Sequence, residues 1–389
     1  MSKPSPNILV SRLPVPPIPS VVAWGRSYDG AHGGVIDLSQ AVPGYPTHPE
    51  MLRLLGEAAA CKDMTGYGAI EGEYLLREVY AGHMSERYGA RICPENILIT
   101  AGCNQAFMAT IIALAAPGTR VALTNPFYFN HDTTLSMLGI ERVLVACDRK
   151  NGFLPELASV EAALSGGAKV LALVSPNNPT GAVYPPDLLS AIYNLCRRYN
   201  AWLILDETYR DFLTEAPRGP HGLLSEHDWH DRLVLLYSFS KSLCIPGHRL
   251  GAITSSPNLV GEITKVMDNI QICAPRAAQH AVAQALPELS EWRFRNMLEI
   301  DRRAQALKRV FDALSGWEIA SIGAYFAFVR HPYSEEKAMT VAERLATTAG
   351  VVTIPGTIFG AGNDSYLRFA FANVDEDSIS RLADRLVYA

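Results

Sequence analysis

The fold is decided by three stretches of similar pattern: KVLALVSPNNPTG at residues 169–181, AWLILDETY at 201–209 and RLVLLYSFSKS at 232–242. In each of them an apolar run passes directly into a polar cluster. The apolar runs show no polar alternation, which is typical of strands covered on both faces in a parallel sheet. The carboxyl ends of parallel strands meet at one edge, where open α/β sheets bind their ligands. We therefore expect the three polar clusters to meet at one site.

Apolar runs of the same kind recur over residues 96–256. Further apolar, β-rich runs alternate there with segments of helical period, which predicts a βα sandwich. These additional runs are NILIT, RVALT, RVLVA and GAITS. Two helices are expected in CNQAFMATIIALAAPG, which ends at Pro117 and Gly118, and in PPDLLSAIYNLCRRYN, which opens with prolines.

From residue 288 onward the sequence pattern is that of a long charged helix followed by helices with few strands. This pattern predicts a smaller α+β lobe. A chain of 389 residues also exceeds the size at which a single hydrophobic core stops growing. We predict an α/β fold: a large domain with a mostly parallel central sheet flanked by helices, plus a smaller α+β domain from both chain ends. The predicted divisions are an N-terminal arm and part of the small domain at 1–45, the large cofactor domain at 46–287 and the small C-terminal domain at 288–389.

The composition restricts the class of partner. A net charge of -5 without a basic stripe argues against nucleic acid, so small-molecule partners are expected. Seven cysteines without CxxC spacing predict reduced thiols and a cytoplasmic location. The N-terminus, MSKPSPNILVSRLPVPPIPS, has too many prolines and too short an apolar run for a signal peptide or a membrane span. We expect it to form an extended arm on another surface, such as a partner subunit.

The three polar clusters hold the groups that one cofactor requires. A lysine in a low-dielectric pocket, here Lys241, has a lowered pKa and attacks a carbonyl as a neutral amine. A carboxylate such as Asp206 pairs with a protonated pyridine nitrogen. A phenolate oxygen and a phosphate need hydrogen-bond donors, for which the candidates are Tyr209, Asn178, Ser238, Ser240 and Arg249. These are the requirements of pyridoxal phosphate.

These clusters resemble those of a known family. SPNNPTG, DETYRDF and SFSKSLCIPGHRLG match, in order and in spacing, three blocks of the fold-type I pyridoxal-phosphate enzymes, specifically the class I/II aminotransferases. The resemblance extends over nearly the whole chain, from LSQAVPGYP through TGYGAIEGEYLLREV to GAYFAFV and YLRFAFA. It implies that Lys241 holds the cofactor as a Schiff base and then moves a proton at the substrate's Cα. Asp206 and Tyr209 complete the implied catalytic set.

The resemblance also implies binding roles. Arg368 matches the arginine that binds the substrate's α-carboxylate, with Asn178 and Ala41 beside it. Tyr67 matches a tyrosine that reaches the phosphate in the neighbouring subunit, which implies a homodimer with shared active sites. The implied cofactor-binding residues are Gly102, Cys103, Asn104, Tyr128, Asn178, Asp206, Tyr209, Ser238, Ser240, Lys241, Arg249 and Tyr67.

Two positions depart from the family pattern. In the loop AGCNQ, Cys103 and Asn104 replace the hydroxyl or glycine residues that are common there, which leaves backbone contacts to a phosphate intact. Ala41 stands where many relatives have glycine, and its methyl group is expected to tighten the carboxylate end of the pocket.

Single residues also have plainer interpretations. Lys241 alone is a surface lysine, Asp206 a helix cap and Arg368 a structural ion pair. Tyr128 alone is a core aromatic, and Cys103 is interpreted as a small packed residue and not as a reactive thiol. The co-occurrence of the motifs favours the functional interpretation for the first three. The resemblance favours it for Tyr128 as well, which matches the position where the family stacks an aromatic ring on the cofactor.

No metal site is expected. The histidines of HGLLSEHDWH lack a completing ligand pattern and are interpreted as part of a surface loop. They are His221, His227 and His230. GYGAIEG resembles a dinucleotide fingerprint only loosely, because its glycine spacing differs.

The resemblance predicts a pyridoxal-phosphate-dependent aminotransferase that moves the amino group of an L-amino acid to a 2-oxo acid. The alternative is a lyase, decarboxylase or biosynthetic synthase of the same fold, which the sequence hardly separates. The chain has no room for the DNA-binding domain of a related regulator, and no glycine fingerprint of a nicotinamide dehydrogenase. Candidate walls of the substrate pocket are Val42, Tyr45, Ile70, Tyr325 and Arg276. They favour neutral or aromatic amino acids, with Arg276 open to three roles: binding an acidic side chain, a surface contact or a dimer contact.

Overall fold

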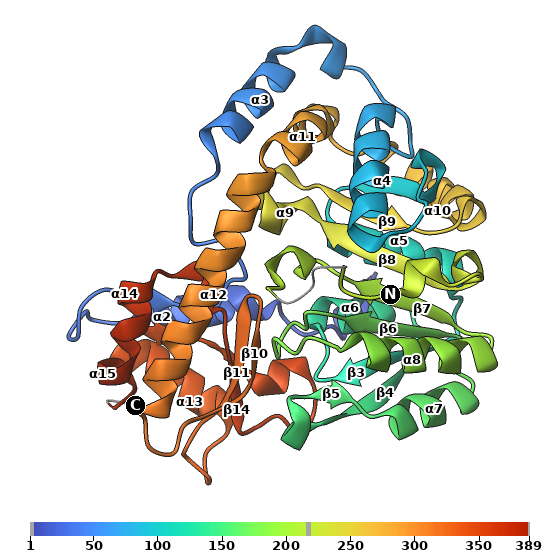
Figure 1. Cartoon of the computed structure of the whole chain (residues 1–389). Helices are drawn as coiled ribbons and strands as arrows, with labels where there is room; N and C mark the ends of the chain where they lie inside the picture. Colours follow the sequence, from blue (N-terminus) through green and yellow to red (C-terminus); the bar gives the residue numbers. More distant parts are fainter. Residues whose placement is uncertain (1–3, 215–218, 388–389) are drawn as a thin grey trace.

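The computed structural model describes residues 4–214 and 219–387, and its larger part is built on an eight-stranded sheet (Figure 1). In spatial order the strands are β2 (Ile97–Thr100), β9 (Gly251–Thr254), β8 (Leu233–Ser238), β7 (Trp202–Asp206), β6 (Val170–Val174), β3 (Arg120–Asn125), β4 (Glu141–Asp148) and β5 (Leu154–Pro155). The run from β8 to β4 is parallel, whereas β9 is antiparallel to both neighbours and β5 is antiparallel to β4. All the predicted β-rich runs form strands of this sheet, so the mostly parallel sheet is confirmed.

Helices cover both faces of the large sheet. One face carries α4 (Tyr74–Tyr88), α7 (Leu157–Ser165), α8 (Pro186–Arg198) and α11 (Arg276–Glu288), with α3 (Pro49–Ala60) packed on α11; the other carries α5 (Cys103–Leu114), α6 (Phe129–Met137) and α10 (Pro257–Ile270). In β7, Leu203 and Leu205 pack into the first core and Ile204 into the second. Successive side chains of a strand point to opposite faces, so two apolar cores explain why these runs lack polar alternation.

A smaller part of the molecule surrounds a four-stranded antiparallel sheet in the order β10 (Glu318–Gly323), β11 (Phe326–Arg330), β14 (Tyr366–Phe369) and β13 (Ile354–Pro355). Residues from both chain ends meet here, because β1 (Ile36–Asp37) pairs with β12 (Val351–Val352). The long helix α12 (Ser290–Asp312) runs along this part, with α13 (Ala338–Arg344), α14 (Glu376–Ser380) and α15 (Leu382–Leu386) nearby (Figure 1). The fold class is confirmed, while the divisions at residues 45 and 288 stay predictions.

The N-terminal arm differs from the prediction of an extended segment. It contains α1 (Ile8–Ser11) and α2 (Pro17–Arg26), and α1 lies against α6 of the same chain. The prolines that suggested extension begin a helix here: Pro17 occupies the first turn of α2, where the missing N–H costs no hydrogen bond. Among the described helices, none is both long enough and apolar enough to cross a bilayer.

The turn after β6 is wedged against the smaller sheet at Gly181. This glycine has a φ of +76°, in the left-handed region. A Cβ added to it would lie 2.2 Å from the carbonyl oxygen of Phe326 and 2.5 Å from the backbone nitrogen of Gly323. Both neighbours are backbone atoms of the β10–β11 hairpin and cannot rotate away. The turn therefore requires glycine, and its place relative to β11 is fixed.

Replacing Gly181 with alanine is expected to destabilise the protein by about 3 kcal/mol or more, because a backbone clash adds to left-handed strain. The matched control is Gly118→Ala, at a φ of +88° with nothing within 4 Å of its added Cβ. Strain alone costs about 1–2 kcal/mol there. Urea unfolding followed by circular dichroism measures the free energy of unfolding of both variants. Equal losses of stability would contradict the proposed clash of Gly181 with the β10–β11 hairpin.

Candidate active site

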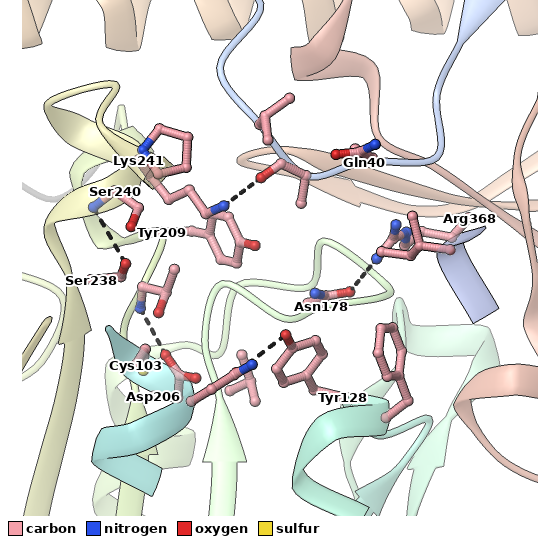
Figure 2. Close-up of a pocket in the computed structure, with 18 of the residues that line it drawn as sticks. Gln40, Cys103, Tyr128, Asn178, Asp206, Tyr209, Ser238, Ser240, Lys241 and Arg368 are labelled. Atoms are coloured by element: carbon pink, nitrogen blue, oxygen red, sulfur yellow. Dashed lines mark hydrogen bonds between the residues drawn. The ribbon is translucent and has the colours of Figure 1, made fainter. Parts of the chain in front are cut away.

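Three turns at the carboxyl edge of the large sheet bring the predicted polar clusters together (Figure 2). Val174 at the end of β6 pairs with Asp206 at the end of β7, so these strands end level. Beyond β8 the short helix α9 (Phe239–Ser242) carries Lys241. The turns border a cavity of about 250 Å³. Its lining residues are Ile18, Gln40, Ala41, Val42, Cys103, Asn104, Tyr128, Phe129, Val174, Asn178, Asp206, Thr208, Tyr209, Ser238, Ser240, Lys241, Pro246, Arg249 and Arg368.

Lys241 carries the amine of the cavity. Ser238 caps α9 through its hydroxyl, and the Lys241 ammonium group donates to the carbonyl oxygen of Ala41. Burial, together with the positive charges of Arg249 and Arg368, lowers the pKa of Lys241 to about 8. A substantial fraction of this amine is therefore neutral near pH 8, as nucleophilic attack requires. The plain interpretation as a solvated surface lysine is wrong.

Asp206 is a buried carboxylate, 4% exposed, at the floor of the cavity. Its Oδ1 accepts from the backbone N–H of Thr208 at 3.0 Å, and its Oδ2 lies 3.5 Å from Nε2 of His131. The ring of His131 in turn stacks on Phe107 with 3.7 Å between centroids. The helix-cap interpretation of Asp206 is wrong, since the 3-10 turn at Arg210–Phe212 has Tyr209 as its N-cap.

One end of the cavity offers donors suited to an anion. The Ser240 hydroxyl is buried without a hydrogen-bond partner among the described residues. Gly102 precedes α5, whose N-terminus has no side-chain cap. A Cβ on Gly102 would fall 2.3 Å from Nη2 of Arg249, so the glycine admits this guanidinium beside the helix terminus. Backbone N–H groups, a hydroxyl and a guanidinium are donors whose chemistry suits a phosphate group.

Burial and the nearby Asp206 raise the pKa of Cys103 well above its usual value. The side chain therefore stays a thiol, in agreement with its interpretation as a packed residue. Asn104 accepts from the hydroxyl of Tyr128 at 3.3 Å, and Asn130 donates to the same hydroxyl at 2.8 Å. These contacts position the Tyr128 ring at the cavity wall, which is where a stacking aromatic is expected.

Arg368 enters the opposite end of the cavity from β14. Its Nη1 donates to Oδ1 of Asn178 at 2.9 Å, Nη2 donates to the carbonyl oxygen of Ser39, and Nε has no hydrogen-bond partner among the described residues. The side chain is 1% exposed and packs over the rings of Phe326 and Phe359. Within the described part of the chain no carboxylate lies within 4.0 Å of it, which argues against the structural ion pair. Burial lowers the pKa of Arg368 to about 10, so it remains charged at neutral pH.

Asn178 and Tyr209 complete the wall between these ends. Both are buried, and Tyr209 packs edge-on against Phe326, with the Lys241 amine 6.0 Å from its ring centre. Burial raises the pKa of Tyr209 well above its usual value, so its hydroxyl remains a hydrogen-bond donor. Figure 2 shows Tyr209, Asn178 and Asp206 facing the same space as Lys241.

Several predicted residues lie outside the cavity lining. Tyr325 is fully buried and packs with Phe212, and Tyr45 packs edge-on against Trp292. Ile70 packs against the core around α5, and Gly102 acts from behind through its backbone. Tyr67 is 81% exposed and takes no part in this chain's own cavity.

Arg276 is already engaged within the chain. Its Nε donates to Oε1 of Glu73 at 2.6 Å, and Nη1 donates to the carbonyl oxygens of Asp63 and Gly66. These bonds make a local structural contact within the chain, which was not among its three suggested roles.

The sequence missed some cavity residues. Gln40, Phe129 and Thr208 adjoin predicted residues and share their motifs, so that adjacency was an available signal. No sequence signal pointed to Ile18, because it reaches the cavity from α2 in the N-terminal arm. His131 was also missed: its role depends on where α6 packs and not on a local pattern.

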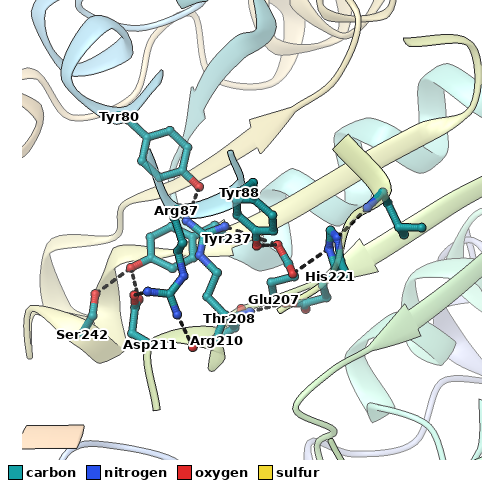
Figure 3. Close-up of polar contacts among 12 residues, drawn as sticks. Tyr80, Arg87, Tyr88, Glu207, Thr208, Arg210, Asp211, His221, Tyr237 and Ser242 are labelled. Carbon is teal, nitrogen blue, oxygen red and sulfur yellow. Dashed lines mark hydrogen bonds and ion pairs between the residues drawn. The ribbon is translucent and has the colours of Figure 1, made fainter. Parts of the chain in front are cut away.

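A buried charged cluster lies behind the cavity (Figure 3). Arg210 is fully buried, with Nη1 3.3 Å from Oε2 of Glu207 and its guanidinium 4.1 Å from the ring centre of Tyr237. The Tyr237 hydroxyl donates to Oδ2 of Asp211 at 2.5 Å and lies 2.7 Å from the hydroxyl of Ser242. The cluster therefore links the segment after Asp206 with the residue after Lys241.

His221 belongs to this cluster, so the prediction that it lies in a surface loop is wrong. It is buried, with Nε2 3.0 Å from Oε1 of Glu207. Burial opposes ionisation of this carboxyl, yet His221 and Arg210 hold the pKa of Glu207 below its usual value. A buried carboxylate requires polar or charged partners, and His221 and Arg210 lie where they can serve as such partners. His227 and His230 are exposed as expected, and the Glu226 and Asp228 carboxylates near them both pair with Arg197 at 2.8 Å.

Comparison with known proteins agrees with this geometry. The family model described as aminotransferase class I and II matches residues 33–386. The chain belongs to the class I and II aminotransferases. This aminotransferase is 29% identical to the aromatic aminotransferase ISS1 of Arabidopsis thaliana, over 94% of this chain and 92% of that protein. It is 28% identical to an aspartate aminotransferase of Thermotoga maritima, over 97% of this chain and 96% of that protein.

The fold of the aminotransferase is likewise shared. A Thermus thermophilus aspartate aminotransferase double mutant superposes with a TM-score of 0.90 at 24% identity, covering 98% of this chain and 99% of that one. The family uses pyridoxal phosphate and acts on amino acids and 2-oxo acids. The two relatives are named for different amino acids, so their names leave the substrate of this aminotransferase open.

The lowered pKa of Lys241 predicts how cofactor-free protein captures pyridoxal phosphate. Because the neutral amine is the nucleophile, the capture rate rises about tenfold per pH unit below pH 8 and levels off above it. Stopped-flow visible absorption measures the rate, expressed relative to Nα-acetyl-lysine at the same pH to remove the cofactor's own ionisations. This relative rate is expected to be constant below pH 8 and to fall above it, because only the reference amine keeps gaining neutral form. A relative rate that stays constant up to pH 10 would show an ordinary lysine.

Proposed function

We propose that this aminotransferase binds pyridoxal phosphate covalently at Lys241 and transfers the amino group of an L-amino acid whose α-carboxylate binds Arg368. The observation that carries the proposal is a buried guanidinium without a carboxylate partner in the described chain, lining the same cavity as a lysine of lowered pKa. Burying an unpaired charge is costly unless a ligand of opposite charge completes the site.

The donor set of the cavity fits this cofactor. The buried hydroxyl of Ser240 has no hydrogen-bond partner among the described residues, Arg249 provides a positive charge, and the N-terminus of α5 has no side-chain cap. These three groups suit the phosphate. Asp206 lies at the cavity floor for the pyridine nitrogen, with Asn178 and Tyr209 for the ring hydroxyl and Tyr128 for the ring face. The remaining cofactor contacts are proposed for Gly102, Cys103, Asn104 and Ser238. When bound, pyridoxal phosphate supplies an aldehyde that condenses with amines and a ring that takes up the electrons released at Cα.

The chain's own residues then have defined tasks. Arg368, with Asn178 fixed against it at 2.9 Å, orients the substrate through its α-carboxylate. The amine of Lys241, displaced by the substrate's amino group, takes the Cα proton as a general base. The carboxylate of Asp206 would bind the pyridine nitrogen of the cofactor, and His131 contacts that carboxylate with Nε2 3.5 Å from Oδ2. The methyl group of Ala41 closes the carboxylate end.

We further propose a homodimer in the cytoplasm, in which Tyr67 reaches the partner's phosphate site. The exposed position of Tyr67, away from its own cavity, supports a role in trans. Seven free cysteines support a reducing compartment. Residues 1–45, 46–287 and 288–389 are proposed as the arm, large domain and small domain.

Absorption spectroscopy of the holoprotein tests the reaction. Adding a mixture of amino acids without an oxo acid is expected to bleach the visible band, and adding a 2-oxo acid to restore it. Lys241→Ala loses the lysine-bound band. Arg368→Lys keeps the band but needs about 30-fold more amino acid, since lysine cannot make two parallel hydrogen bonds. An unbleached band with release of ammonia, carbon dioxide or a cyclised product would instead establish a lyase, decarboxylase or synthase.

Mixed dimers test the role of Tyr67. Tyr67→Ala is expected to raise the Kd for pyridoxal phosphate about tenfold or more, through a lost hydrogen bond to a charged group. At a cofactor concentration that leaves this variant mostly empty, a dimer of one Tyr67→Ala and one Lys241→Ala subunit regains one loaded site if Tyr67 acts in trans. Tyr74→Ala, at another exposed tyrosine, is the control and leaves the Kd unchanged. Mixed dimers that stay empty would place Tyr67 in cis.

A further inference from the structure

We propose that the substrate carries an apolar side chain seated against Ile18, Val42 and Phe129, and that Phe129 sets the longest side chain accepted. This inference deepens the proposed function and rests on it. Three observations support it: the cations of the cavity already have proposed ligands, several apolar lining residues have no proposed task, and Phe129 also lines a second cavity.

The cations of the cavity are already committed. Among the described lining residues they are Lys241, Arg249 and Arg368, assigned to the amine, the phosphate and the α-carboxylate. Arg276 is held by Glu73 at 2.6 Å. Within one subunit, the lining of the cavity therefore offers no uncommitted cation to a carboxylate on the substrate's side chain, and burying such a group unpaired is unfavourable.

Apart from Gln40 and Thr208, the lining residues that have no proposed task are apolar. Ile18 from α2 and Val42 from the segment after β1 line the cavity together with Phe129, the first residue of α6. None of the three has a polar side chain or a proposed task toward the cofactor. A side chain that leaves Cα away from the cofactor and the carboxylate clamp meets this wall, and hydrocarbon contact is the interaction that it offers.

A second cavity of about 480 Å³ also borders Phe129. Its lining includes Val15, Pro16, Thr133, Met339, Ile358 and Ala361. The one carboxylate in its lining, that of Asp132, is paired with Arg142, so this space is mainly apolar as well. It is defined here as the apolar chamber.

Phe129 lines both the catalytic cavity and the apolar chamber. Its ring is held by neighbouring rings, 5.2 Å from Tyr128 and 5.9 Å from Phe359 between centroids. Phe359 also packs over the guanidinium of Arg368, so Phe129 has a defined position relative to both the stacking ring and the carboxylate clamp. Truncating Phe129 is expected to join the two spaces and to extend the side-chain site.

Isothermal titration of the holoprotein with simple carboxylates tests this without requiring turnover. The probes are propanoate, butanoate, hexanoate, octanoate and succinate. In the wild type, affinity is expected to rise about fourfold per methylene and then to fall at a limiting length. Succinate binds at least about tenfold more weakly than butanoate, because its second carboxylate lacks a partner. In Phe129→Ala, octanoate gains at least about tenfold relative to butanoate.

Met339 provides the matched control. Met339→Trp narrows the apolar chamber and leaves the wild-type length profile unchanged, because Phe129 still closes it off. Combined with Phe129→Ala, it removes the octanoate gain. Circular dichroism and the visible band confirm that each variant is folded and loaded.

Tighter binding of succinate than of butanoate, or no carboxylate binding, overturns the apolar side-chain site. A Phe129→Ala profile that shifts equally for all lengths overturns the role of Phe129. Failure of the proposed function is a separate result: amino acids then leave the visible band unbleached while the carboxylates keep their length profile.

Discussion

The strands β6, β7 and β8 run parallel: Val174 and Asp206, the last residues of β6 and β7, pair with each other, and β8 continues two residues beyond Leu236, the partner of Asp206. Neighbouring strands in a sheet lie about 4.8 Å apart, so consecutive strand ends bring their following residues within side-chain reach of one another. Asn178, Asp206 and Lys241 come together for this reason. A shift of one residue in either pairing would turn Asp206 toward the opposite face of the sheet.

The opposite end of the cavity depends on a charge that the protein cannot neutralise by itself. Arg368 is surrounded by Phe326 and Phe359 and donates only to an amide and a backbone carbonyl among the described residues. Such an environment strengthens any interaction with an anion, since few waters screen it. The cost of burying this charge in the free protein is consistent with a site built for binding and not for stability.

The sequence predicted the sheet and most of the cavity because both depend on local patterns. An apolar run followed by a polar cluster identifies a buried strand end, and three of them in order identify one edge. Residues whose role depends on long-range packing were missed or misjudged. His131 reaches Asp206 from α6, and His221 turns inward to Glu207. Ile18 arrives from an arm expected to be extended. Tyr325 fills the core beside Phe212, and no local pattern distinguishes it from a residue that lines the cavity.

The proposed reaction uses two sheets, since Lys241 follows β8 of the larger sheet and Arg368 lies on β14 of the smaller one. Sheets with separate cores can loosen at different temperatures. If the smaller sheet melts first, the cofactor stays on its lysine while the carboxylate clamp is lost. Warmed samples would then keep their yellow colour after they stop reacting with amino acids. Colour would therefore overstate the fraction of working enzyme in any preparation that has been heated or stored.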